Sequence, residues 1–134
     1  MGFTAEELGF ARDERGWRKV VGGAPCHFRL LNTYREVDPV VQLQQIVWDM
    51  SDRDLVPPHE LVTIPETGGM IIGVWRDDDP DLAGFVFGWG GFVNGRPRLA
   101  SDMMGVRPDL RSLGLGFAFL GDGLGRMQRR QVTA

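Results

Sequence analysis

The hydrophobic and polar positions of the chain mark out four apolar segments of strand length. They cover residues 26–31, 70–75, 82–92 and 99–106, and turn-forming residues separate them. The last three follow one another closely, and Asn94-Gly95 between the final two is a strong hairpin signal. The pattern predicts three consecutive strands in a meander, preceded along the chain by a first strand.

Helical spacing of apolar residues marks the segment between the first strand and the meander. Asp38 and Pro39 are typical of the first residues of a helix. Residues 59–64 predict a second, short helix after two prolines. The longer helix has one apolar face that extends to about Met50, formed by Val40, Leu43, Ile46 and Val47.

The N-terminal residues predict a polar helical extension. Residues 4–7, Thr-Ala-Glu-Glu, fit a capping box, and helical spacing continues to residue 20 before the turn-forming residues 22–25. We therefore expect a helix over residues 5–20 within an extension of residues 1–24, followed by one domain over residues 25–134. The order of elements predicts an α+β fold with a mainly antiparallel sheet flanked by helices.

Composition narrows the class of protein. The chain of 134 residues carries a net charge of −3, whereas a nucleic-acid-binding domain is usually basic. It has no apolar run long enough to span a membrane, no signal-peptide pattern and one cysteine, which fits a reducing, cytoplasmic location. We expect no nucleic-acid partner, no membrane partner and, because the two histidines lie far apart, no metal site.

The residues after the last predicted strand carry the clearest candidate chemistry. Residues 111–116 read Arg-Ser-Leu-Gly-Leu-Gly, and a helix is predicted to start at about Leu115. Unpaired N–H groups at a helix start, glycines that allow close approach and an arginine together favour an anion such as a pyrophosphate. A Gly-rich turn into a helix without a ligand is the alternative from these residues alone. Two rival phosphate motifs are absent, because Phe119 stands where the dinucleotide motif needs glycine and the chain has no Walker lysine.

These residues also carry a family resemblance, which covers about residues 28–120. The pattern Arg-x-x-Gly-x-Gly, after a strand that leads into Arg107-Pro108, resembles the acetyl-CoA loop of the GNAT N-acetyltransferase superfamily. More narrowly, the chain resembles a bacterial family of predicted GNAT acetyltransferases, and the order of predicted elements agrees. The segments that carry the resemblance are residues 46–48, 54–59, 67–69, 72–73, 84–88 and 103–116.

The resemblance implies an acetyl-CoA-dependent transfer of an acetyl group to a small-molecule or peptide amine. The amine would attack directly, with no metal and no covalent intermediate. The strand backbone at Met104, Gly105 and Val106 would hold the pantetheine arm of the co-substrate. The loop amides would cradle its pyrophosphate, and they belong to Arg111, Ser112, Leu113, Gly114, Leu115 and Gly116.

No motif identifies the general base. Glu60 and Glu66 flank the short second helix, near where amines enter in the resembling fold, and His59 follows two prolines. Each is a candidate to take a proton from an ammonium group. Solvated surface residues are the alternative for the glutamates, and a loop or helix-cap role is the alternative for His59. Tyr34 is expected at the surface or rim, without an acid role.

Other polar and aromatic clusters have structural interpretations. Residues 77–79, three aspartates, lack the spacing of a calcium loop and are expected in a solvated turn. His27 is expected to be a structural residue of a strand. Trp89 and Phe92 are expected on the sheet face, with a substrate-pocket wall as the alternative, and the glycines around them predict a bulge.

Two features depart from the resembling family. Asp102 stands where that family usually has histidine. The chain stops at Ala134, before the further strand, helix and hairpin of a GNAT fold, and glycines at 121, 123 and 125 interrupt its last predicted helix. These features predict a member of the family that is truncated or frameshifted after the acetyl-CoA loop and its helix. The alternative function is an inactive half-domain that pairs with a partner, or with a second copy as a homodimer, through an exposed sheet edge.

Overall fold

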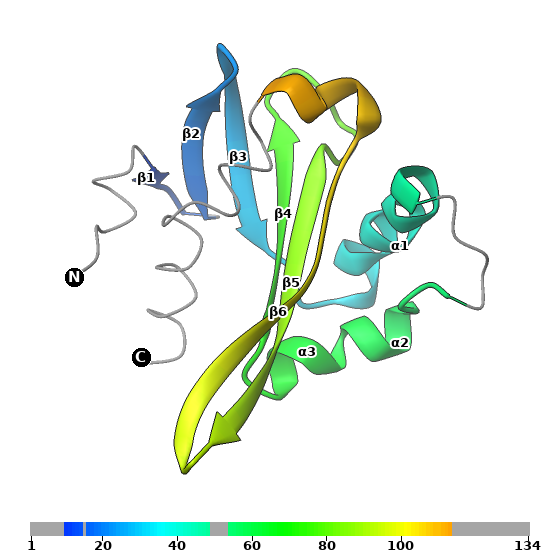
Figure 1. Cartoon of the computed structure of the whole chain (residues 1–134). Helices are drawn as coiled ribbons and strands as arrows, with labels where there is room; N and C mark the ends of the chain where they lie inside the picture. The colour runs from blue at the N-terminus through cyan, green and yellow to red at the C-terminus, as the bar shows by residue number, and fades with distance from the viewer. Residues whose placement is uncertain (1–9, 15, 49–53, 114–134) are drawn as a thin grey trace.

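The structure of the protein, a computed structural model, describes residues 10–14, 16–48 and 54–113. Its strands form one antiparallel sheet in which each strand lies beside the one before it in the chain (Figure 1). The strands are β1 (Ala11–Arg12), β2 (Trp17–Val21), β3 (Ala24–Leu30), β4 (Met70–Arg76), β5 (Gly84–Val93) and β6 (Arg96–Val106). Between β3 and β4 come the helices α1 (Tyr34–Trp48), α2 (Pro58–Leu61) and α3 (Thr63–Glu66), and the 3-10 helix η1 (Pro108–Leu113) follows β6. The α+β architecture predicted from the sequence is confirmed.

The meander of β4, β5 and β6 follows the sequence prediction closely. β4 pairs with β5, and β5 pairs with β6, both antiparallel. Asn94 and Gly95 join β5 to β6 with φ angles of 52° and 76°, as a two-residue type I′ turn requires. The first predicted strand is confirmed as β3, which pairs with β4. Apolar runs and turn residues are therefore sufficient to place these four strands.

The helix predicted over residues 5–20 is wrong where the structure describes it, because β1 and β2 occupy its second half. β2 turns into β3 through Gly22 and Gly23, whose φ angles of 60° and 80° again suit a two-residue hairpin. The exposed Arg18 and Val20 alternate with more buried residues, which is the period of a strand. Residues 1–9 of the predicted extension lie outside the described residues, and a domain boundary at residue 24 stays a prediction.

Helix α1 begins at Tyr34 rather than at Asp38. Thr33 and Glu36 form the capping box that starts it: Glu36 N–H donates to Thr33 Oγ1 (3.2 Å), and Thr33 N–H donates to Glu36 Oε1 (3.1 Å). Pro39 consequently lies inside the helix instead of at its start. No helix in the described part of the chain is long and apolar enough to cross a lipid bilayer.

Two apolar clusters lie on the two faces of the sheet. On the helix face, side chains of the three α-helices pack against the sheet, with Val37, Val40, Leu43, Leu61 and Ile64 meeting Leu31, Ile71, Phe85 and Phe87. The opposite face carries Cys26, Phe28, Met70, Ile72, Val74, Val86 and Val106, against which Phe10 and Leu110 pack. Successive strand residues alternate between the two clusters, as pleated strands require. Ile46, predicted on the buried side of α1, is 61% exposed, and Gln44 is buried instead.

Candidate functional site

The backbone of β6 offers hydrogen-bonding groups on the side away from β5. Within the described residues β6 pairs with β5 alone, so it is an edge strand there. Arg107 N–H donates to Ala83 O (2.9 Å), so the backbone groups of Arg107 point toward the β5 side of β6. Because successive residues alternate, Met104 and Val106 direct N–H and C=O groups to the free side, and Gly105 directs its own toward β5. Two of the three predicted strand residues therefore present donors and acceptors at this edge.

A β-bulge lies just before these residues. Phe87 pairs with Met103, but Gly88 pairs with Ser101, so Asp102 is an extra residue on β6. The bulge predicted from the glycines of β5 is therefore found at the start of that glycine-rich stretch, with its extra residue on the partner strand. Beyond it the β5–β6 hairpin extends well past the other strands (Figure 1).

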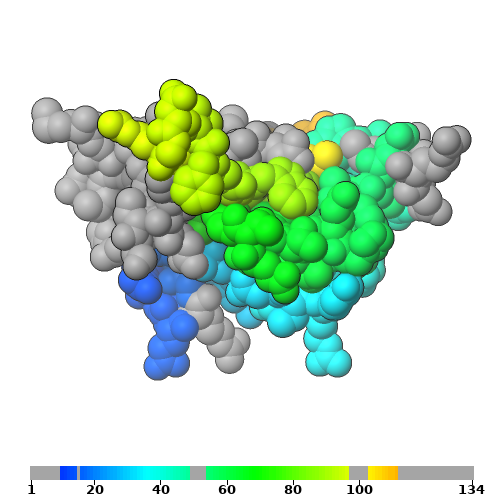
Figure 2. All heavy atoms as spheres, turned by 90° about the horizontal axis from the view of Figure 1, so that it is seen from below, coloured from blue at the N-terminus to red at the C-terminus, as the bar shows by residue number. Residues whose placement is uncertain are grey.

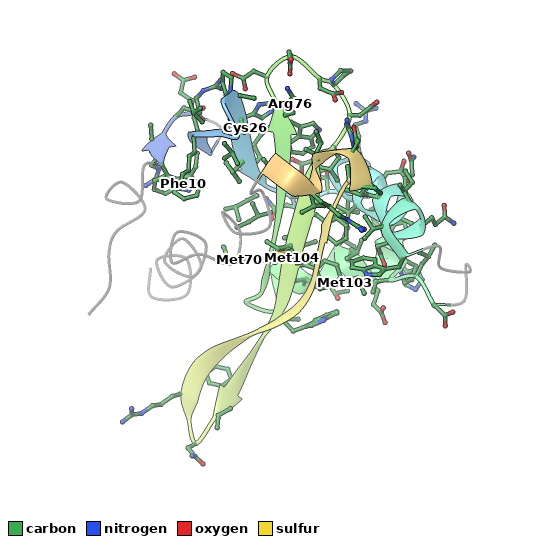
Figure 3. The ribbon with its side chains drawn as sticks, turned by 45° about the horizontal axis from the view of Figure 1, so that its top comes forward. Phe10, Cys26, Met70, Arg76, Met103 and Met104 are labelled. Atoms are coloured by element: carbon green, nitrogen blue, oxygen red, sulfur yellow. The ribbon has the colours of Figure 1, made fainter. Side chains whose placement is uncertain are left out.

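Gly105 allows two aromatic rings to close over the strand. A Cβ atom there would lie 2.9 Å from Cε1 of Phe85 and 3.1 Å from Cη2 of Trp48. The two rings meet edge to face with centroids 5.9 Å apart. Met103 also packs on this helix face, whereas Met104 lies on the opposite face (Figure 3). The last residue of α1 is thereby packed directly on the candidate strand.

The predicted anion loop begins within η1 (Pro108–Leu113). The Arg111 guanidinium lies near two backbone carbonyls, with Nε 3.4 Å from Val106 O and Nη2 3.5 Å from Val47 O. Both distances are at the long end for hydrogen bonds, so the guanidinium connects the end of β6 to the last turn of α1 only weakly. Gly114, Leu115 and Gly116 lie outside the described residues, as do the side chains of Ser112 and Leu113. The pyrophosphate cradle stays a prediction.

Arg107, which the sequence analysis did not single out, fixes the start of this loop. Its guanidinium donates to both carboxylate oxygens of Asp109 (3.0 and 2.9 Å) and to Oδ2 of Asp79 (2.9 Å). The bond with Asp109 raises the pKa of Arg107 and lowers the pKa of Asp109. The pKa of Asp79 is lowered by the Asp81 N–H and then by Arg107. Arg107 therefore joins the β4–β5 connection to η1.

The three aspartates after β4 begin in a turn, as predicted, and two of them, Asp77 and Asp79, also form ion pairs. Asp78 is exposed over 74% of its side chain, but Asp79 is held by Arg107. Asp77 pairs with Arg18 and with Nδ1 of His27 (3.0 Å). His27 is thus a structural residue, as predicted. The described residues include no group of three or more His, Cys, Asp or Glu placed to hold a metal ion.

The three candidate bases lie on the short helices of the helix face. His59 and Glu60 are exposed on α2, and Glu66 is exposed at the end of α3. Within the described residues none of the three side chains forms a hydrogen bond or an ion pair. The structure therefore gathers them on one side of the sheet without a bond to β6, and the role of base stays a prediction.

Gln44 positions the segment that leads into α2, a role that the sequence analysis missed. It is fully buried on α1, donates from Nε2 to Val56 O (3.1 Å) and accepts at Oε1 from Val56 N–H (2.9 Å). One side-chain amide thus satisfies both backbone groups of Val56, just ahead of His59 and Glu60. A polar residue on an apolar helix face was the available signal, but its partner could not be named from the sequence.

Glycines bring the end of α3 against β5. A Cβ atom on Gly90 would lie 2.6 Å from the backbone of Gly68 and 2.7 Å from Thr67 O. Figure 2 shows the short helices, in green, beside the projecting β5–β6 hairpin, in yellow-green. The two residues that directly follow Glu66 therefore lie against the Gly-rich part of β5. Phe92, farther along this strand, is 77% exposed.

Comparison with known proteins identifies the fold. No protein-family model matches the sequence, and no curated protein matches it. The crystal structure of an acetyltransferase from Trypanosoma brucei matches with a TM-score of 0.57 and 18% sequence identity, over 79% of this chain and 76% of that chain. The described sheet and helices therefore share the fold of an acetyltransferase.

Proposed function

We propose that the protein is an acetyl-CoA-dependent N-acetyltransferase of the GNAT superfamily. The edge of β6 carries the proposal: Met104 and Val106 direct backbone groups away from the sheet, beside the bulge at Asp102 and directly before the Arg111–Gly116 loop. The fold shared with the Trypanosoma brucei acetyltransferase supports the same reaction class.

The chemistry of this edge fits the pantetheine arm of acetyl-CoA. The arm is an extended chain with amide groups, and an exposed strand edge binds such chains as it would bind a further strand. Met104 and Val106 would hold those amides, while the loop from Arg111 would hold the pyrophosphate. Bound acetyl-CoA would supply a thioester whose acetyl group is open to attack by an amine.

Residues of the helix face would serve the acceptor amine. An ammonium group must lose a proton before it can attack, and Glu60, Glu66 or His59 would take that proton directly or through water. All three are exposed on the helix face, on the side of the sheet where Met103 packs. A solvent-facing position suits an acceptor that arrives from solution.

Calorimetric titration of the full chain with acetyl-CoA tests the proposal, with two variants of Met104 as a matched pair. Met104→Pro removes the outward N–H, and because this group faces away from β5 no bond of the sheet is lost. Met104→Ala also loses the methionine side chain but keeps the N–H. We expect the wild type and the alanine variant to bind alike and the proline variant to bind about tenfold more weakly, which corresponds to one hydrogen bond.

Circular dichroism and thermal unfolding of both Met104 variants serve as the control for folding. A further variant, Gly114→Glu, places a carboxylate where the phosphates are predicted to lie, and we expect it to abolish binding. Equal affinities of the two Met104 variants would refute the assignment of the edge. A folded wild-type chain that does not bind acetyl-CoA would refute the proposed function.

A further inference from the structure

A groove lies between α1 and the ends of β4 and β6. Its volume is about 600 Å³, within the range of about 300–1,000 Å³ for small-molecule sites. Residues of α1 form one wall, and residues of the β4–β5 connection and of the start of η1 form the others. Its described lining does not include residues 104–106 or Arg111. The proposed acetyl transfer therefore leaves the groove without a role.

Trp75 lines the groove and is held in place by its neighbours on the sheet. Its ring lies across Gly73, where a Cβ atom would be 2.9 Å from Cη2 of the indole. The ring also stacks on His27 at an interplanar angle of 8° with centroids 5.6 Å apart, and the Arg29 guanidinium lies 5.0 Å from its centroid. Neighbours on the same sheet thus fix the indole, so an aromatic surface is in place before any ligand arrives.

Two carboxylates, those of Asp81 and Asp109, and one guanidinium, that of Arg107, line the groove. Arg107 lines it, but its guanidinium is shared between Asp79 and Asp109, so its positive charge is already balanced. Asp81 lines the same groove and is exposed. Within the described residues its carboxylate forms no hydrogen bond or ion pair. A free carboxylate beside an aromatic wall attracts a cation and repels an anion.

We propose that this groove binds a small organic cation, an ammonium group attached to an apolar body. The apolar body would lie against Trp75, Ile46 and Leu82, and the ammonium group would lie beside Asp81. The inference concerns binding alone, at residues apart from the β6 edge. The groove could therefore bind such a cation whether or not the protein transfers acetyl groups.

Titrations of the full chain followed by heteronuclear NMR test this inference, with phenethylamine as the probe. Phenethyl alcohol has a similar shape without the charge, and hydrocinnamate has the opposite charge. We expect the amine to shift the indole N–H resonance of Trp75, which Trp75→Phe identifies, and to bind about fivefold more tightly than the alcohol. Hydrocinnamate should bind most weakly of the three.

Asp81→Asn and Asp78→Asn form a matched pair of variants. Each removes one exposed carboxylate from the β4–β5 connection, but only Asp81 lines the groove. We expect Asp81→Asn to weaken amine binding about fivefold and Asp78→Asn to leave it nearly unchanged. Equal binding of the amine and the alcohol, equal effects of the two substitutions, or no shift at Trp75 would each overturn the proposal.

Discussion

Replacing Gln44 by leucine should loosen the segment that leads into α2. The Gln44 amide donates to Val56 O at 3.1 Å and accepts from Val56 N–H at 2.9 Å, and the side chain is fully buried. Leucine fills a similar volume but can form neither bond. Both backbone groups of Val56 would then have to find water or stay unpaired.

The expected loss of stability follows from these two bonds. Each contributes about 0.5–1.5 kcal/mol, and leaving a buried partner unpaired adds a penalty of about 1–3 kcal/mol. Val56 is only half-buried, so water can reduce this penalty, and the apolar surface of leucine offsets part of the loss. We expect Gln44→Leu to lower the free energy of unfolding by about 2–3 kcal/mol in urea, and to speed hydrogen exchange at the Val56 amide.

Gln44→Glu separates the contributions of the two bonds. The new carboxylate can accept from Val56 N–H, but when ionised it has no proton to donate to Val56 O. Burial raises the folded-state pKa of this carboxyl above its unfolded value of about 4.3. Its stabilising contribution is then complete below the unfolded pKa and is lost as pH rises through the folded pKa. The deficit relative to the wild type should therefore be larger at neutral pH than near about pH 4.

Gln42→Leu is the matched control on the same helix. Gln42 is exposed and donates to the exposed Asp38 (2.9 Å), a type of pair that contributes about 0.2–0.5 kcal/mol. We expect a change in the free energy of unfolding of no more than about 0.5 kcal/mol. If both leucine variants unfold at the same urea concentration, and the Val56 amide stays protected in both, the reasoning is refuted.

Two further predictions concern close contacts and charge. Gly90→Ala should lower the free energy of unfolding by about 1–3 kcal/mol, because the added Cβ would lie 2.6 Å from the Gly68 backbone. In the control variant Gly91→Ala the added Cβ has nothing within 4 Å, so this change should be neutral or slightly stabilising in thermal unfolding. Equal melting temperatures of the two alanine variants would contradict the close contact of Gly90 with Gly68. The double variant Asp79→Asn, Asp109→Asn should be less stable than the wild type at neutral pH, and the difference should disappear in acid. The pKa of both carboxyls is lowered in the folded state. Their contribution to stability is therefore complete above their unfolded pKa and is lost as pH falls through the folded pKa. If the difference in unfolding free energy between the variant and the wild type were the same at every pH, this cause would be excluded.

The strands that were predicted correctly are marked by residues close together in the sequence. The hairpin of β2 and β3, which was not predicted, shows where such residues fit two structures equally well. Apolar runs bounded by turn residues are enough for β4, β5 and β6. Gly22-Gly23, by contrast, suits either the end of a helix or a two-residue hairpin turn. The alternation from Trp17 to Val21 favours the hairpin, and pairing of β2 with β3 decides in its favour.

The start of α1 shows a similar competition between signals. Thr33 and Glu36 have the spacing of a capping box, as Thr4 and Glu7 do, and the structure shows both bonds of the box at Thr33 and Glu36. Asp38-Pro39 favours a helix start at Asp38, because proline is common at the first position of a helix. A capping box that forms both of its bonds sets the first turn, and the helix continues past the proline.

The side chains that organise the site could not be predicted, because their partners are distant in the sequence. Arg107 and Asp79 are 28 positions apart, and Gln44 and Val56 are 12 apart. No periodicity relates such residues, and each looks like an ordinary polar position until the chain has folded. The Arg111–Gly116 loop is different, since its residues are contiguous and their chemistry can be interpreted directly.

The bulge at Asp102 determines which residues of β6 face the free side. Backbone groups alternate along a strand, so one extra residue inverts the alternation beyond it. If the register at Ser101–Gly88 continued without that residue, Met103 and Gly105 would take the outward positions, and Gly105 would leave the place where Phe85 and Trp48 close over it. The candidate edge therefore depends on the number of residues in β6 rather than on the side chain at the bulge. An aspartate where the resembling family usually has histidine is compatible with the same backbone arrangement, because the bulge needs an extra residue and not a particular side chain.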